Sequence, residues 1–281
     1  MFDTHLRKGL GELLVNRIQA LDINQFLNEM VENYDSEYPI AFFQLFTVLF
    51  DFAKKHKYVM ENIMELVDRP RIRPREEVKL LSPEEFNALE ERLRSTNVQI
   101  AFAIAKNTGL RASEVYGLRW SDINFEDNTL KIDRQLQRRE GVWCFARPKT
   151  RAGIRTVKFG NAFAEYLQWV KEVQRENKAR LRDFYKNNKI LNCMGRTEEL
   201  IEVEDFVVVK DNGEMLSPYS NRVITRIAKD MGLDFNFHML RHYYITALIE
   251  NGVDLPVIRD NVGHSMQGSY YRLPKWATIQ D

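Results

Sequence analysis

The stretch TGLRASEVYGLRW, residues 108–120, ends one helix and begins another on either side of an arginine. The apolar run over 98–109 predicts a buried helix, and Gly109 ends it because glycine readily adopts the backbone conformation of a helix C-cap. ASEVYGL, residues 112–118, begins the next helix. Arg111 therefore lies just past a helix end, between two predicted helices.

Upstream of this stretch, a domain begins at Ser82. Ser82 is a typical N-cap, Pro83 occupies the first helical position and Glu85 closes a capping box. The preceding RPRIRPREEVKLL, residues 69–81, lacks helical periodicity, and its prolines favour extended backbone. Residues 12–32 and 39–67 carry helical apolar spacing. We therefore expect a helical unit over 1–70, an Arg/Pro linker over 71–81 and a second domain over 82–281.

Downstream, short apolar runs replace helical periodicity. TLKIDRQL, VWCFA and IRTVKF lie between residues 123 and 159, separated by Asp-Asn, Glu-Gly and Ala-Gly, and they predict a small three-stranded antiparallel sheet. A helix is expected over 161–186, a brief strand over 206–210 and helices from Ser217 onward. The predicted fold class is mainly α with a small antiparallel β-sheet.

The composition is that of an ordinary globular protein. Of 281 residues, 44% are hydrophobic and 29% are charged. No run approaches the ~18 apolar residues of a membrane span, and the N-terminus has no apolar signal region. Cys144 and Cys193 form no C-x-x-C motif. These features predict a cytoplasmic protein without membrane association.

Positive charge is concentrated locally although the net charge is only +1. Between Arg134 and Lys158 there are eight basic residues against one acid, Glu140, and RPRIRPR over 69–75 carries four arginines. Such density suits phosphate contacts, with a solvated surface as the alternative.

Four segments, taken together in order, resemble the tyrosine recombinase (phage integrase) family. They are TGLRASEVYGLRW (108–120), ARPKTRAGIRTV (146–157), HMLRHYYIT (238–246) and VGHS (262–265). The resemblance extends through nearly the whole chain from Ser82, and the N-terminal helical unit fits the family's core-binding domain, a clamp on DNA. It implies a helical core-binding domain followed by an α+β catalytic domain.

The resemblance assigns phosphate binding to Arg111 and Arg241. A guanidinium group suits the non-bridging oxygens of a phosphodiester because its planar fork donates two hydrogen bonds and keeps its charge. His238 and His264 are then ring donors to the same phosphate or acid–base groups, and Glu114 supports the arginines. Taken alone, Arg111 fits equally a helix-dipole partner and Arg241 an ordinary ion pair.

Lys149, in P-K-T-R-A-G, stands at the expected turn of a basic hairpin. By resemblance it is the general acid that protonates the leaving 5′ oxygen. Simple phosphate binding is the alternative role, and Arg147 and Arg151 are neighbouring candidates for the acid.

The resemblance also implies a tyrosine nucleophile, and two adjacent tyrosines compete for this role. Tyr270 and Tyr271 lie six and seven residues after His264, closer than is common in the family. We expect Tyr271, because S-Y-Y-R resembles the S-x-Y-R ending of some phage integrases and a spacing of seven returns to the same helix face. Tyr270 would then pack inward.

No metal or cofactor is predicted. His238, His242 and Cys144 could suggest zinc, but the sequence offers no H-E-x-x-H glutamate and no convincing further ligand. It also has no Walker-type phosphate loop, and a phosphotyrosyl intermediate needs no ATP because it preserves the energy of the phosphodiester.

The sequence thus predicts a site-specific DNA recombinase or integrase that works through a 3′-phosphotyrosyl intermediate, in integration or excision of a mobile element or phage. Expected partners are double-stranded DNA attachment or core sites, other copies in a homo-tetramer and accessory DNA-bending proteins. The alternatives are a catalytically inactive DNA-binding relative and a type IB topoisomerase-like activity. The start resembles the middle of a core-binding domain and only ten residues follow Tyr271, which suggests a fragment or a naturally minimal member.

Overall fold

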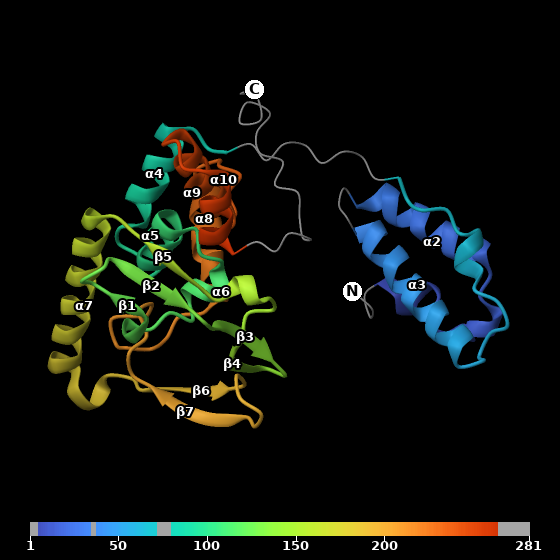
Figure 1. The fold of residues 1–281 in the computed structure, drawn as a ribbon, viewed down its shortest axis with the longest axis horizontal. Helices are drawn as coiled ribbons and strands as arrows, with labels where there is room; N and C mark the ends of the chain where they lie inside the picture. The colour runs from blue at the N-terminus through green and yellow to red at the C-terminus, as the bar shows by residue number, and fades with distance from the viewer. Residues whose placement is uncertain (1–4, 35–37, 72–79, 264–281) are drawn as a thin grey trace. The chain divides into compact units, whose positions relative to one another are not determined.

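The computed structural model describes residues 5–34, 38–71 and 80–263 of the chain (Figure 1). The chain divides into two compact units, Met1–Lys79 and Leu80–Asp281. Within the described ranges, no helix combines the length and the apolar character that crossing a bilayer requires.

The N-terminal unit is built on two helices joined by aromatic side chains. Its elements are α1 (Arg7–Gly9), η2 (Val15–Arg17), α2 (Ala20–Asn33), α3 (Tyr38–Lys55) and η3 (Ile63–Leu66). Phe26 of α2 packs edge-on against Phe42 and Phe46 of α3, with ring centroids 5.1 and 5.6 Å apart. Residues four apart lie on one face of a helix, so both rings of α3 are buried together.

The helix predicted over 39–67 is shorter in the structure. It ends at Lys55, because Lys57 adopts a left-handed φ of 61° and the Tyr58 N–H donates back to the Ala53 carbonyl at 2.9 Å. This is a Schellman-type C-cap. Between this cap and residue 67, the helical structure is limited to the short 3₁₀ turn η3.

The second unit begins with the predicted capping box. Ser82 Oγ accepts from the Glu85 N–H at 3.2 Å, and Glu85 Oε2 accepts from the Ser82 N–H at 2.8 Å. Pro83 is the first residue of α4 (Pro83–Leu93). The helical start that the sequence indicates is therefore confirmed in its hydrogen bonds.

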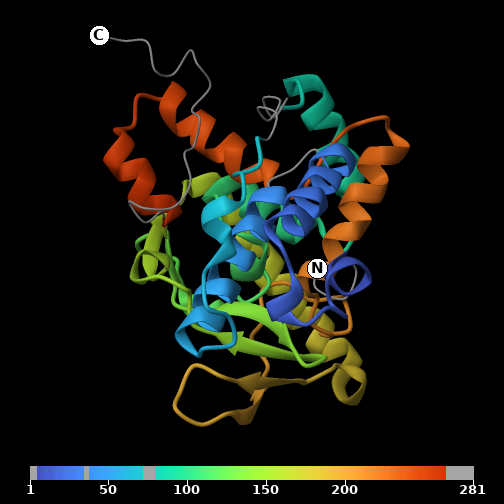
Figure 2. The ribbon, with the colours of Figure 1, turned by 90° about the vertical axis from the view of Figure 1, so that its right-hand side faces the viewer.

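Two small sheets follow where the sequence predicted one. The strands are β1 (Ile123–Asn124), β2 (Thr129–Ile132), β3 (Gln135–Arg139), β4 (Val142–Ala146), β5 (Arg155–Lys158), β6 (Asn188–Asn192) and β7 (Glu199–Val203). One sheet has the order β1-β2-β5 and is antiparallel, whereas the other has the order β3-β4-β6-β7 and pairs β4 with β6 in parallel. The chain thus leaves the first sheet after β2, forms the β3–β4 hairpin in the second and returns at β5. The β6–β7 pair lies at one end of this unit (Figures 1 and 2).

The strand expected over 206–210 makes only isolated bridges, between Arg119 and Phe206 and between Val209 and Met215. Residues 206–209 are buried on all sides. This apolar run therefore fills the core without pairing in a sheet. Apolar periodicity alone does not distinguish such a buried segment from a buried strand.

Helices form the rest of the unit and its core. They are α5 (Gln99–Thr108), α6 (Ala112–Val115), α7 (Asn161–Leu181), α8 (Asn221–Asp230), α9 (Met239–Glu250) and α10 (Leu255–Val262). The buried helix α5 packs against both α6 and α9. Next to it, α9 and α10 lie side by side around Tyr244, Ile245, Ile258 and Val262 (Figure 2). The fold class, mainly α with small sheets, is as the sequence predicts.

Candidate active site

Arg241 joins the ends of two helices. It projects from α9, and its side chain is among the most buried in the protein, at 1% exposure. Its Nη1 donates to the carbonyl oxygen of Gly109 at 2.7 Å, and its Nη2 donates to that of Val262. These carbonyls end α5 and α10, where no intrahelical donor remains and the helix dipole favours a cation.

Arg111 lies beside this junction at the N-cap of α6. Its backbone N–H donates to Glu114 Oε2 at 2.8 Å, and its Nη1 donates to Glu114 Oε1 at 3.1 Å. Its Nη2 reaches the carbonyl oxygen of Gly263 at 3.4 Å. Because 37% of the Arg111 side chain remains exposed, a ligand can reach this guanidinium from solvent.

A third arginine, Arg155 on β5, completes the group. Its Nη1 and Nη2 donate to the two oxygens of Glu114, each at 2.9 Å, and its Nε donates to the Asn261 carbonyl at 2.7 Å. Burial by itself raises the pKa of the Glu114 carboxyl, but Arg155, and then Arg111, outweigh it and hold that pKa below its usual value. From the sequence, Arg155 is only one of the basic residues between Arg134 and Lys158. It is not predicted as a site residue, because no motif marks it.

The three arginines therefore bind three successive carbonyls at the end of α10. Arg155 binds Asn261, Arg241 binds Val262 and Arg111 binds Gly263. Within this cluster Glu114 is the one carboxylate that the described ion pairs include, so three guanidinium charges face one carboxylate. We call Arg111, Arg155, Arg241 and Glu114 the arginine cluster. Its excess positive charge suits an anion such as a phosphodiester.

His238 lies at the N-cap of α9, next to this cluster. Partial burial of its ring, then His242, Arg241 and Arg111, lower the pKa of His238 to about 4. The His242 ring packs edge-on against it, with centroids 5.1 Å apart. His238 is therefore neutral near pH 7 in the DNA-free protein, and its imidazole can accept a proton or donate a hydrogen bond.

The loop that carries Lys149 packs against the same end of α10. A Cβ at Gly263 would lie only 2.6 Å from the Ala152 carbonyl oxygen, and a Cβ at Gly153 would lie 2.4 Å from Pro148 Cβ. Such close approaches require glycine at both positions. From the sequence, this loop was expected to be the turn of a hairpin. This expectation is wrong, because β4 and β5 belong to different sheets.

Within this loop, Lys149 and Arg147 differ in their environments. Arg147 Nε donates to the Met194 carbonyl at 2.8 Å, and the Arg147 carbonyl accepts from Gln135 at 3.1 Å. Lys149 is exposed, and no hydrogen bond or ion pair joins its side chain to another described residue. Arg147 thus anchors the loop, whereas the ammonium of Lys149 is available to a substrate.

The predicted site residues fall into two groups. Arg111, Arg241 and His238 come together at the end of α10, and the loop of Lys149 packs against it. His264 and Tyr271, together with the competing Tyr270, lie outside the described residues. Among the described residues, no group of three His, Cys, Asp or Glu side chains is placed to hold a metal ion.

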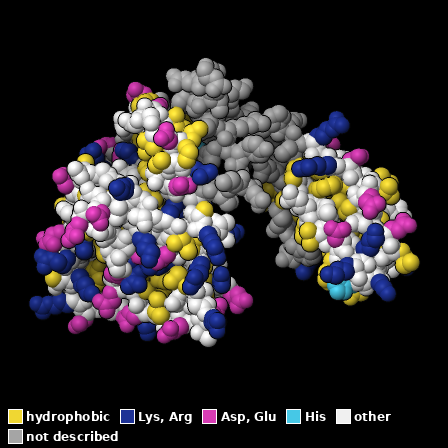
Figure 3. Space-filling model, in the orientation of Figure 1, with side chains coloured by type: hydrophobic (Ala, Val, Ile, Leu, Met, Phe, Trp, Pro, Cys, Tyr) yellow, Lys and Arg dark blue, Asp and Glu magenta, His cyan; other side chains and the backbone are white. Residues whose placement is uncertain are grey.

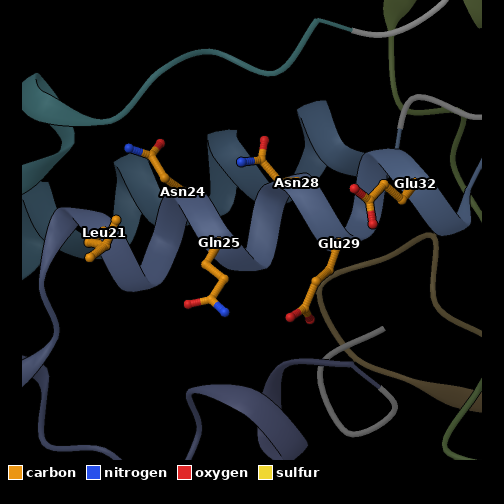
Figure 4. Close-up of a pocket in the computed structure, with 6 residues that line it drawn as sticks. All are labelled: Leu21, Asn24, Gln25, Asn28, Glu29 and Glu32. Carbon is orange, nitrogen blue, oxygen red and sulfur yellow. The ribbon is translucent and has the colours of Figure 1, made fainter.

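A hollow on the N-terminal unit offers a comparison with the arginine cluster. A shallow hollow follows α2, lined by Leu21, Asn24, Gln25, Asn28, Glu29 and Glu32 (Figure 4). Its only charged side chains are acidic, so it does not suit phosphate. On the face drawn in Figure 3, basic and acidic side chains are interspersed.

A family model described as "Phage integrase family" matches residues 71–272, more than half of the chain. The chain belongs to the phage integrase family. This membership confirms the resemblance to tyrosine recombinases that the four sequence segments indicate.

Several curated relatives within this family are similar over most of the chain. A "Tyrosine recombinase XerC-like" protein of Caldanaerobacter subterraneus subsp. tengcongensis is 26% identical over 267 residues, which are 89% of this chain and 65% of that relative. The "ICEBs1 integrase" of Bacillus subtilis is 24% identical, covering 77% of this chain and 55% of the relative. The chain therefore spans less than two thirds of the length of these two relatives.

Solved integrase structures share the fold. The Tn1549 transposon integrase in complex with transposon right end DNA superposes with a TM-score of 0.72 at 20% identity, covering 91% of this chain and 80% of that one. A lambda integrase tetramer bound to a Holliday junction gives 0.65 at 18% identity, covering 96% and 70%.

Proposed function

We propose that this integrase-family chain cleaves and rejoins double-stranded DNA at specific sites through a 3′-phosphotyrosyl intermediate, in integration or excision of a mobile element. One observation carries the proposal. The guanidinium groups of Arg111, Arg155 and Arg241 converge on the carbonyls at the end of α10, and Glu114 is the one carboxylate in the described ion pairs of this cluster. Arg111 is open to solvent. The names of the relatives, a XerC-like recombinase and an integrase, favour the same activity.

In the proposed reaction, Arg111 and Arg241 stabilise the charge that develops on the non-bridging oxygens of the phosphate. The oxygen of Tyr271 attacks phosphorus, and the bond from phosphorus to the 5′ oxygen breaks in line. Lys149 gives a proton to the leaving 5′ oxygen, while neutral His238 accepts the proton of the tyrosine. Rejoining reverses these transfers, so neither metal nor ATP is consumed.

The two units take different parts in this proposal. Residues 1–70 form a core-binding domain that clamps DNA, 71–81 form the linker and 82–281 form the catalytic domain. A homo-tetramer on paired DNA sites is proposed as the working assembly, since one similar solved structure is an integrase tetramer on a Holliday junction.

A nicked suicide substrate tests the proposal. Duplexes are first enriched from a random-sequence pool by binding to the protein, and a nick is then placed so that cleavage releases a short fragment and traps the covalent adduct. We expect an adduct whose protein–DNA junction maps to Tyr271, which is retained in Tyr270→Phe and lost in Tyr271→Phe.

Other outcomes would identify the alternatives. Absence of any adduct from tightly bound duplexes would identify an inactive DNA-binding relative. An adduct that only rejoins its own strand, and never transfers it to a partner duplex, would identify a topoisomerase-like enzyme. An adduct that persists in Tyr271→Phe would move the nucleophile to another residue.

A further inference from the structure

We propose that Arg155 is a positioning residue that holds the Glu114 carboxylate and thereby leaves the guanidinium of Arg111 available to the scissile phosphate. This inference rests on the proposed function, and it assigns a role to a residue that no motif of the sequence marks. Arg155 itself does not touch the substrate in this proposal.

The hydrogen bonds divide Glu114 unequally between its two arginines. Arg155 takes both carboxylate oxygens at 2.9 Å in the bidentate geometry that suits a carboxylate best. The Arg111 side chain makes one hydrogen bond to this carboxylate, at 3.1 Å to Oε1. Glu114 and Arg155 are 3% and 5% exposed, whereas Arg111 is 37% exposed. The buried pair is therefore Arg155–Glu114, and Arg111 lies at its open edge.

The unequal sharing of Glu114 between the two arginines decides how much of the positive charge of Arg111 is left for a ligand. With Arg155 present, the carboxylate is neutralised from within the fold, so the positive charge of Arg111 is left for an anion from solvent. Without Arg155, both oxygens of a buried carboxylate would turn to Arg111, the nearest remaining cation. A phosphate would then compete with a carboxylate for the same guanidinium fork.

Arg155 also binds the C-terminal end of α10. Its Nε binds the Asn261 carbonyl at 2.7 Å, and a Cβ at Gly263 would lie 3.0 Å from its Nη1. The guanidinium thus lies directly against the residue whose carbonyl Arg111 reaches. Arg155 therefore fixes both groups that orient Arg111, namely Glu114 and Gly263.

The experiment uses the full chain with Arg155→Met, Glu114→Gln and the double variant Arg155→Met/Glu114→Gln. Single-turnover adduct formation is measured at saturating nicked duplex, together with DNA affinity and thermal stability. We expect Arg155→Met to slow adduct formation at least ~30-fold and to change the DNA dissociation constant less than ~3-fold, as loss of transition-state stabilisation requires. The double variant should regain ~10-fold of the rate, because the competing carboxylate is gone.

Arg134→Met is the matched control. Arg134 forms a similarly buried ion pair with Asp122 at 2.6 Å, and their side chains are 13% and 7% exposed. It is not a member of the arginine cluster. We expect Arg134→Met to lower the melting temperature about as much as Arg155→Met does, without slowing the adduct step of the folded protein.

Inorganic phosphate gives a readout that does not need cleavage. Binding is followed through the arginine side-chain NMR signals, and its affinity should fall ~10-fold in Arg155→Met and recover in the double variant. If this pattern holds while the unmutated protein forms no adduct, the inference stands and the proposed function fails. If the double variant regains thermal stability but neither phosphate affinity nor rate, Arg155 is merely structural and the inference is wrong.

Discussion

Arg241 donates to the carbonyl oxygen of Gly109 at 2.7 Å, across 132 residues of sequence. This bond joins the GLR and H-x-L-R segments into one unit and requires the α5 C-cap to keep its shape. Gly109 has a left-handed φ of 64°, and a Cβ added at this position would meet the ring of Tyr244.

Gly109→Ala should destabilise the second unit by about 3 kcal/mol, since a Cβ would lie 2.4 Å from Tyr244 Cδ1 in a conformation that L-residues avoid. Gly232→Ala is the control, because Gly232 has a φ of 74° but no atom within 4 Å of the added Cβ. It should cost only about 1 kcal/mol. Urea denaturation measures both, and equal losses would show that the Tyr244 contact is unimportant.

Arg241→Lys should abolish most cleavage although it keeps the charge. One ammonium cannot reproduce the fork that binds the carbonyls of Gly109 and Val262 from two helices. We expect adduct formation to fall at least ~100-fold, with DNA affinity reduced far less. A variant that cleaves at the normal rate would show that charge alone suffices at this position.

His238 should titrate near pH 4 in the DNA-free protein. Partial burial, His242, Arg241 and Arg111 lower its pKa to about 4, whereas an unfolded histidine titrates near ~6.5. The unfolded chain binds the proton more readily, so stability is fully present above pH ~6.5 and declines as the pH falls toward ~4. The loss should stay below about 1 kcal/mol, because the residue is still partly open to solvent, which screens its charge.

The measurement for His238 is the ring NMR signal as a function of pH, with His238→Asn to assign it. Bound phosphate should raise the titration midpoint, because an adjacent anion favours the imidazolium. A midpoint at or above ~6.5 without phosphate would contradict the arrangement of positive charges around this ring.

Lys149→Ala should impair cleavage far more than folding. Its side chain is exposed and makes no described contact, so stability should change by less than about 0.5 kcal/mol. A duplex with sulfur at the bridging 5′ position should restore the rate, because a thiolate leaves without protonation. Rescue of Arg147→Ala or Arg151→Ala in place of Lys149→Ala would reassign the acid.

The linker arginines should contribute to salt-dependent binding of any duplex. Arg71 is exposed, while Arg73 and Arg75 lie outside the described residues. Replacing all three by serine should reduce the slope of log K against log salt by about 2.7, if each contacts one phosphate. Weakening confined to one DNA sequence would mean that the linker reads bases.

Local features of the fold could be predicted because neighbouring residues determine them. The Ser82–Glu85 capping box, the C-cap at Gly109 and the turn at Glu140–Gly141 all have the expected geometry. A β-turn with positive φ at both central residues favours a hairpin, which is why β3 and β4 pair as neighbours. Which sheet this hairpin joins depends on β6, and no residue of the hairpin specifies that partner.

By itself the sequence determined the family, the helix starts and stops, and the residue types needed for phosphate chemistry, since all of these depend on short segments. Only the tertiary structure decided which arginine meets which acceptor. Arg155 reaches Glu114 across 41 residues, and Arg111 reaches Gly263 across 152. Hydrogen bonds between distant segments depend on how α5, α9, α10 and β5 pack around a common core, and no local pattern encodes that packing.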